Sequence, residues 1–121
     1  MNPSQRSAEE VLDDHLNLSL DASVEDDLRR NYAEDVVLLT SFGTYRGYEG
    51  ARYLAELLGQ QVPDAIFEYR NLLVDGDVGF LEWTATSRTT SARIDDGADS
   101  YVFRDGRIVA QTIHYTVQPL G

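Results

Sequence analysis

The stretch GADSYVFRDGRIVAQTIHYTV at residues 97–117 decides the fold, because its pattern predicts two strands joined by a tight turn. Side chains alternate between the two faces of a strand, so Asp99, Tyr101 and Phe103 share one face. The pair Asp105–Gly106 is a hairpin signal, and the following strand runs over residues 107–117. We therefore expect an antiparallel hairpin whose aromatic face is buried and carries Asp99 inside it or at its mouth.

Two further strands precede this hairpin, and helices fill the first half of the chain. The period-2 pattern predicts strands over 65–74 and 78–90, with turns at Asp75–Gly76 and at 95–97. Ser7 and Glu10 fit a capping box at the start of a helix over 8–20. The remaining elements expected are a helix from Ser23 to Ala33, a buried strand over 35–40, a return over 44–46 and a helix over 49–58. Helices segregated from antiparallel strands predict one α+β domain over residues 1–121.

Composition excludes several classes of function. The chain has 121 residues, no cysteine and two histidines, so a cysteine nucleophile or a cysteine zinc site is excluded. No ligand-spaced cluster indicates a metal, and we expect neither a metal nor a cofactor. The net charge of −11 disfavours nucleic acid and anionic membrane surfaces. The polar first ten residues and the short apolar runs predict a cytoplasmic protein.

The segments NYAEDVVLLTSFGTYRGYEGARYL at 31–54 and GADSYVFRDGRIVAQTIHYTV at 97–117 resemble the nuclear-transport-factor-2-like (NTF2-like) superfamily. The resemblance covers about residues 8–117 and lies closest to its SnoaL-like and ketosteroid-isomerase-like branch. It implies a cone, in which three N-terminal helices pack on a curved antiparallel sheet around a hydrophobic pocket. Members include isomerases, cyclases, dehydratases and binding modules, so the fold alone does not settle the function.

The resemblance also implies roles for three positions. Thr40 stands where the isomerases carry a proton-moving Asp on the first strand, which disfavours their usual route. Asp99 matches the Asp that donates a hydrogen bond to an oxyanion. His15, or Leu16 one residue further along, stands where the isomerases carry a tyrosine that shares this oxyanion.

Strand parity and the resemblance disagree about residues 78–90. The apolar pattern alone buries the face with Leu81 and Trp83, whereas the resemblance turns the face with Phe80, Glu82 and Thr84 toward the pocket. Both hold if the Trp83 face packs on a second copy of the chain, so we expect a homodimer through a sheet face bearing Trp83 and His114. In the last strand the resemblance points Gln111, Ile113 and Tyr115 into the cone.

These patterns lead to two main hypotheses for function. In the first, the chain is a cofactor-free proton-transfer enzyme, of isomerase, cyclase or dehydratase type, on a small hydrophobic carbonyl or polyketide-like compound. Glu82, Asp99 and His15 would be catalytic. The substrate-binding residues expected are Tyr32, Thr40, Leu54, Phe80, Thr84, Tyr101, Phe103, Gln111, Ile113 and Tyr115.

The alternative is a non-catalytic module of the same fold that binds a small molecule or dimerises. A pocket with a proton-transfer pair requires Glu82 and Asp99 to converge. A filled cone leaves Glu82 in solvent or paired with an arginine such as Arg70, Arg88 or Arg104.

Overall fold

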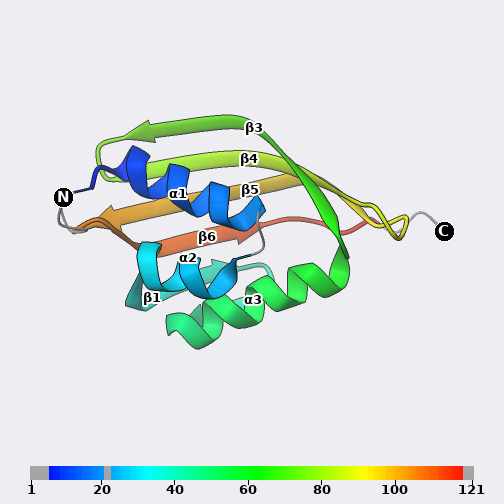
Figure 1. Cartoon of the computed structure of the whole chain (residues 1–121), viewed down its shortest axis with the longest axis horizontal. Helices are drawn as coiled ribbons and strands as arrows, with labels where there is room; N and C mark the ends of the chain where they lie inside the picture. The colour runs from blue at the N-terminus through cyan, green and yellow to red at the C-terminus, as the bar shows by residue number, and fades with distance from the viewer. Residues whose placement is uncertain (1–5, 21–22, 119–121) are drawn as a thin grey trace.

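The computed structural model describes residues 6–20 and 23–118, with side chains for all of these except residues 19 and 20. In chain order the elements are α1 (Ala8–Leu20), α2 (Val24–Asn31), β1 (Tyr32–Thr40), β2 (Gly43–Arg46), α3 (Gly47–Gln61), β3 (Ala65–Asp75), β4 (Val78–Ser87), β5 (Arg93–Arg104) and β6 (Arg107–His114). This is the expected α+β architecture, drawn in Figure 1.

The strands form one sheet in the order β2-β1-β6-β5-β4-β3. Neighbours are antiparallel except β1 and β6, which pair in parallel with Leu38 opposite Gln111. The sheet is therefore mixed rather than wholly antiparallel. The sequence did not reveal this pairing, because it joins strands far apart in the chain whose order no local turn dictates.

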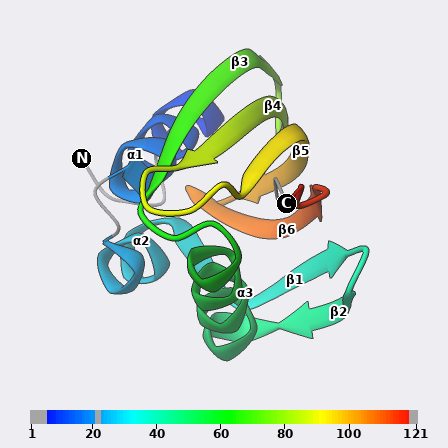
Figure 2. The same cartoon turned by 90° about the vertical axis from the view of Figure 1, so that its right-hand side faces the viewer.

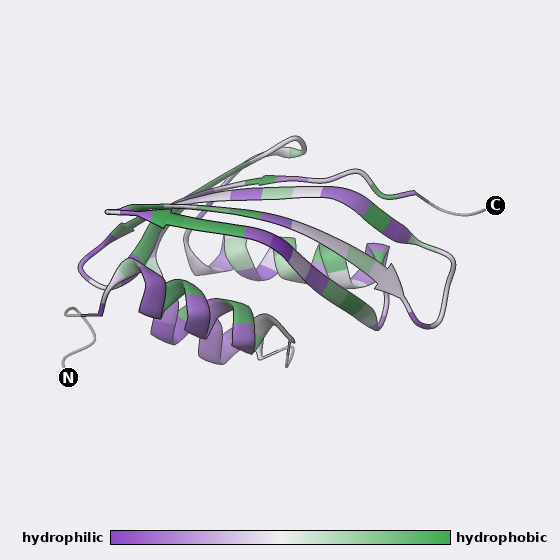
Figure 3. Ribbon diagram, turned by 90° about the horizontal axis from the view of Figure 1, so that it is seen from above, coloured by the Kyte–Doolittle hydropathy of each residue, from purple (hydrophilic) through white to green (hydrophobic). Residues whose placement is uncertain are grey.

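The helices all lie on one side of the curved sheet, so the sheet has an inner and an outer face (Figure 3). Figure 2 shows α3 beside β1 and β2, and α1 beside β3 and β4. The expected capping box begins α1: the Glu10 amide donates to Ser7 Oγ at 3.1 Å, and the Ser7 amide donates to Glu10 Oε1 at 2.9 Å. No helix in residues 6–20 and 23–118 is long and apolar enough to cross a membrane.

The core lies between the helices and the inner face. On β4, Gly79, Leu81, Trp83 and Ala85 are buried, while Glu82 and Thr86 are exposed. The apolar pattern of the sequence thus gave the correct inner face, and the assignment of the Phe80–Glu82–Thr84 face to the pocket is wrong.

The expected dimer face needs the same correction. Trp83 is buried beneath the chain's own helices, whereas His114 pairs with Ala98, which pairs with Glu82, and is exposed on the outer face. Trp83 and His114 therefore lie on opposite faces and cannot form one interface. That the chain dimerises stays a prediction.

The turn between β4 and β5 falls at residues 88–92 rather than at 95–97. Gly97 is a strand residue opposite Trp83. A Cβ at Gly97 would lie 2.3 Å from an indole carbon, so this glycine lets the indole rest directly on the backbone. Asp96 does not turn the chain either: it accepts hydrogen bonds from the amide and hydroxyl of Thr116.

Candidate functional site

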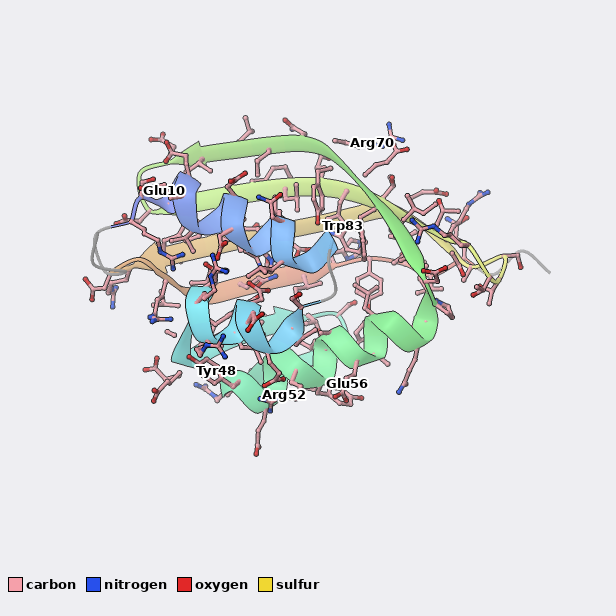
Figure 4. All side chains as sticks on the ribbon, viewed as in Figure 1. Glu10, Tyr48, Arg52, Glu56, Arg70 and Trp83 are labelled. Atoms are coloured by element: carbon pink, nitrogen blue, oxygen red, sulfur yellow. The ribbon has the colours of Figure 1, made fainter. Side chains whose placement is uncertain are left out.

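An apolar cavity of about 400 Å³ lies between the three helices and the inner face of the sheet. Side chains such as Leu54 and Leu58 of α3 line one side, and Phe67, Trp83 and Tyr115 line the other. Its size falls within the usual range for small-molecule sites. In Figure 4 the labelled Trp83 lies near the end of α1. The labelled Arg70 lies at the edge of the sheet, and its side chain points away from the sheet.

Asp99 of β5 contributes a carboxyl group to the sheet side of this cavity. It is 8% exposed and accepts three hydrogen bonds. Trp83 Nε1 donates to Oδ1 at 3.0 Å, while Gln111 Nε2 and the Tyr101 hydroxyl donate to Oδ2 at 3.1 and 3.3 Å. Each carboxylate oxygen can accept two hydrogen bonds, so Oδ1 retains acceptor capacity toward a bound molecule.

Burial raises the pKa of Asp99 from 3.8 to about 6. The hydrogen bonds from Trp83, Gln111 and Tyr101 oppose this rise without cancelling it, and a positive charge on His15 acts in the same direction. A carboxyl group with such a pKa can both hold and release a proton near neutral pH.

The phenols around Asp99 are held in their neutral form. Burial and nearby carboxylates raise the pKa of Tyr32 and Tyr101 well above the ordinary value, and that of Tyr69 to about 12. The Tyr32 hydroxyl donates to Gln111 Oε1 at 2.6 Å, which turns the amide's NH₂ toward Asp99. Phenol, amide and carboxyl therefore form one oriented hydrogen-bond chain.

His15 of α1 lies in the same cavity, and Asp27 of α2 holds it. His15 Nδ1 and Asp27 Oδ2 are 2.7 Å apart, and both side chains are buried. The His15 ring meets the rings of Tyr32 and Tyr101 edge-on, with centroids 5.5 and 5.7 Å apart. The imidazole thus lies between the Asp27 carboxylate and the polar cluster of Asp99.

The structure brings most of the predicted substrate-binding residues to the cavity. Those that line it are Tyr32, Thr40, Leu54, Tyr101, Gln111, Ile113 and Tyr115, together with Asp99 and His15. Thr40 has a structural task as well: its hydroxyl donates to the Gly43 carbonyl and accepts from the Phe42 amide, which closes the β1–β2 turn.

Four predicted site residues lie elsewhere. Glu82 is exposed on the outer face, where Asn71 Nδ2 donates to it at 3.1 Å, and Phe80 and Thr84 share that face. Glu82 and Asp99 therefore do not converge. The arginines Arg70 and Arg88 bind Glu68 and Asp64 instead of Glu82. Phe103 is buried outside the cavity lining and stacks on Tyr101 at 6.0 Å.

Sequence reasoning missed Asp27 and placed Trp83 at a dimer face. An acidic run such as that at 25–27 is typical of a solvated helix start, which holds for the exposed Glu25 and Asp26 but not for the buried Asp27. The available signal was helical spacing, because Asp27 lies next to Leu28 and four residues before Asn31 on the stripe that α2 buries. Among the described residues, no group of three His, Asp or Glu side chains is arranged to hold a metal ion.

Fold and site together define a small α+β domain in which a curved sheet and three helices enclose an apolar pocket with a buried carboxyl group. A sequence model of the SnoaL-like domain matches residues 14–111. The chain belongs to the SnoaL-like domain family, within the NTF2-like superfamily. A search of curated proteins finds no significant match.

Solved structures share this fold at low sequence identity. A candidate isomerase of the SnoaL-like family from Agrobacterium tumefaciens is 17% identical, with a TM-score of 0.70, over 88% of this chain and 95% of that one. An NTF2-like protein from Cytophaga hutchinsonii is 12% identical, with a TM-score of 0.70, over 93% and 92%. A candidate polyketide cyclase from Sinorhizobium meliloti is 20% identical, with a TM-score of 0.63, over 85% and 97%. These likenesses show the fold.

Proposed function

We propose that the chain is a cofactor-free enzyme that moves a proton on a small hydrophobic carbonyl or polyketide-like compound. The observation that carries this proposal is Asp99, a buried carboxyl group with a pKa raised to about 6 at the wall of an apolar cavity. The names of the isomerase and cyclase relatives favour the same class of chemistry.

In this mechanism Asp99 is the proton-carrying group. Its Oδ1 accepts a proton from carbon next to the carbonyl group, and the electron pair of that bond moves toward the carbonyl oxygen. The same acid then returns the proton to another atom of the substrate. His15 faces the same cavity, and in its protonated form it donates to the developing oxyanion, while the apolar walls exclude water that would weaken this interaction.

The matched substitutions Asp99→Asn and Glu82→Gln test the proposal, because each removes one carboxylate from adjacent strands. General acid–base catalysis contributes about 10²- to 10⁴-fold, so we expect Asp99→Asn to lower kcat/KM by at least about 100-fold. Glu82→Gln should leave it unchanged. Turnover would be measured on a panel of enones, polyketide-like ketones and epoxides. Full turnover by Asp99→Asn would refute the assignment.

A binding module is the second candidate, and Thr40 favours it. The first strand offers no carboxylate at this position, and the Thr40 hydroxyl is engaged in the β1–β2 turn. A pure binding module would gain thermal stability from a ligand by mass action while leaving the ligand unchanged. Chromatography of a bound ketone after long incubation distinguishes the two, because any converted product excludes pure binding.

A further inference from the structure

The pair formed by His15 and Asp27 has an orientation that the surrounding helices fix. Asp27 uses its two oxygens differently: Oδ2 faces His15 Nδ1 at 2.7 Å, and Oδ1 accepts from Asn31 Nδ2 at 2.9 Å. Asn31 is fully buried, one turn further along α2. Each oxygen of the carboxylate therefore has its own partner.

Asn31 is itself oriented by charged groups behind it. Arg6 Nη1 donates to Asn31 Oδ1 at 3.0 Å, and Asn31 Nδ2 donates to Asp14 Oδ2 at 2.9 Å. An arginine can only donate and a carboxylate can only accept, so these two contacts fix which side of the Asn31 amide is oxygen. The amide's NH₂ group is thereby directed at Asp27 as well as at Asp14.

We propose that Asp27 is a positioning residue that keeps the proton of neutral His15 on Nδ1 and so makes Nε2 the nitrogen that exchanges protons in the cavity. The role in turnover rests on the proposed function. An ionised carboxylate has no hydrogen to donate, so the nitrogen that faces it must carry the proton. When His15 accepts a proton at Nε2, the imidazolium that forms is stabilised by Asp27, and returning the proton restores the neutral ring.

The groups around His15 agree with this arrangement. Asp27 faces the imidazole from α2, and the carboxyl of Asp99 lies on the β5 side within electrostatic reach. Between them, the rings of Tyr32 and Tyr101 make edge-to-face contacts with the imidazole, and their hydroxyl groups donate to Gln111 and Asp99. A proton on His15 therefore favours the ionised form of Asp99, which couples the two groups.

The test reads the tautomer directly, without any substrate. The chain has only two histidines, and the second, His114, is exposed beside Asp96 at 3.5 Å, which makes it an internal reference. Long-range proton–nitrogen NMR correlations on labelled histidine, recorded at alkaline pH, distinguish a protonated Nδ1 from a protonated Nε2. In the unsubstituted protein we expect His15 to carry its proton on Nδ1.

Asp27→Asn should reverse the tautomer. Because Asn31 Nδ2 faces Oδ1, the new amide would keep its oxygen there and turn its NH₂ group toward His15 Nδ1. His15 would then accept at Nδ1 and carry its proton on Nε2. The control is Asp26→Asn, the neighbouring exposed carboxylate, which binds Arg29 at 2.6 Å and should leave the His15 signals unchanged.

Turnover gives the second measurement. In Ser-His-Asp triads the same change leaves the wrong tautomer and lowers kcat by about 10⁴-fold. We expect Asp27→Asn to lower kcat by at least about 100-fold with little change in KM, and Asp26→Asn to alter neither. A role confined to joining α1 and α2 would change the stability of the protein without moving the tautomer.

Two results would overturn the proposal: a proton on Nε2 in the unsubstituted protein, or unchanged His15 signals in Asp27→Asn. If Asp27→Asn does not fold, the spectrum of the unsubstituted protein decides the question alone. Failure of the proposed function is seen separately, because Asp99→Asn would then retain full turnover while the tautomer of His15 could still follow Asp27.

Discussion

Two carboxylates on adjacent strands, Asp99 and Glu82, show how differently the two faces of this sheet treat the same chemical group. Asp99 pairs with Leu81 across the β4–β5 ladder and Glu82 pairs with Ala98, so the two acids are one residue step apart on opposite faces. Asp99 is enclosed by the indole, amide and phenol groups that donate to it. Glu82 is exposed, with the amide of Asn71 as its partner.

The difference teaches that position within the fold gives an acid its chemistry. Burial makes ionisation of Asp99 costly, and neutral donors offset only part of that cost, so its pKa rises to about 6. Water screens and solvates a carboxylate on the outer face. Both residues are acids within neighbouring strands. The sheet face on which each side chain lies is what separates a candidate proton carrier from a surface charge.

We expect the largest effect from Gly97→Ala, because the Trp83 indole on the inner face packs directly on the backbone of Gly97. The added Cβ would lie 2.3–2.8 Å from three indole atoms of Trp83, so the ring must leave the backbone and its N–H must move away from Asp99. Overpacking together with a lost buried hydrogen bond should cost about 3 kcal/mol or more of unfolding free energy. Urea unfolding followed by the fluorescence of Trp83, the only tryptophan, measures this loss.

The matched control is Gly59→Ala on α3, where a new Cβ meets nothing within 4 Å. Replacing a helical glycine by alanine should stabilise the protein by up to about 1 kcal/mol. Equal effects of the two substitutions would contradict the close contact between Trp83 and Gly97.

The next effect is the pH dependence that Asp99 gives to stability. Its pKa is 3.8 in the unfolded chain and about 6 in the fold, so between these values the unfolded state binds fewer protons. Stability therefore falls as pH rises from about 4 to about 6, and at 1.36 kcal/mol per pH unit the loss reaches about 3 kcal/mol. Above about pH 6 the full destabilisation from ionised Asp99 is present, and below about pH 4 it is absent.

Asp99→Asn should remove this fall, while Glu82→Gln should keep it. Denaturant unfolding at a series of pH values from 3.5 to 7.5 measures both variants against the unsubstituted protein. If Glu82→Gln abolished the fall in unfolding free energy and Asp99→Asn retained it, the assignment of different chemistry to the two faces would be wrong.

Local sequence signals predicted much of the fold for identifiable physical reasons. The capping box of Ser7 and Glu10 and the hairpin at Asp105–Gly106 are set by a few neighbouring residues, and both are present in the structure. Tyr101 and Phe103 share one strand face with Asp99, and these two aromatic residues indicated that this face is buried. The parallel pairing of β1 with β6 depends on contacts across the whole chain, which no local signal encodes.

The errors in the candidate site came from overriding or misreading the periodicity. The apolar residues of β4 predicted that the Trp83 face is buried, and the structure agrees. The resemblance to the isomerases predicted that Glu82 points inward, and this prediction is wrong. Gly97 was interpreted as part of a turn, although it serves the packing of Trp83. Helical spacing could have placed Asp27 on the buried stripe of α2, but its contact with His15, twelve residues away, follows only from the packing of α1 against α2.

The smallest effect tests the polar chain that orients Asp99. Gln111→Leu removes one donor from Asp99 and the acceptor of the buried Tyr32 hydroxyl. A buried group left without its partner costs about 1–3 kcal/mol, so we expect a loss of about 2 kcal/mol in denaturant unfolding. The pKa of Asp99, followed by carbon-detected NMR, should rise further, because the bond from Gln111 is one that lowers it.

Thr112→Val is the matched change one residue further along β6, on the exposed outer face. It should shift the unfolding free energy by less than about 0.5 kcal/mol and leave the Asp99 titration where it is. If Gln111→Leu behaves like Thr112→Val in both measurements, the inner hydrogen-bond chain does not hold Asp99. The contrast between the two carboxylates would then rest on burial alone.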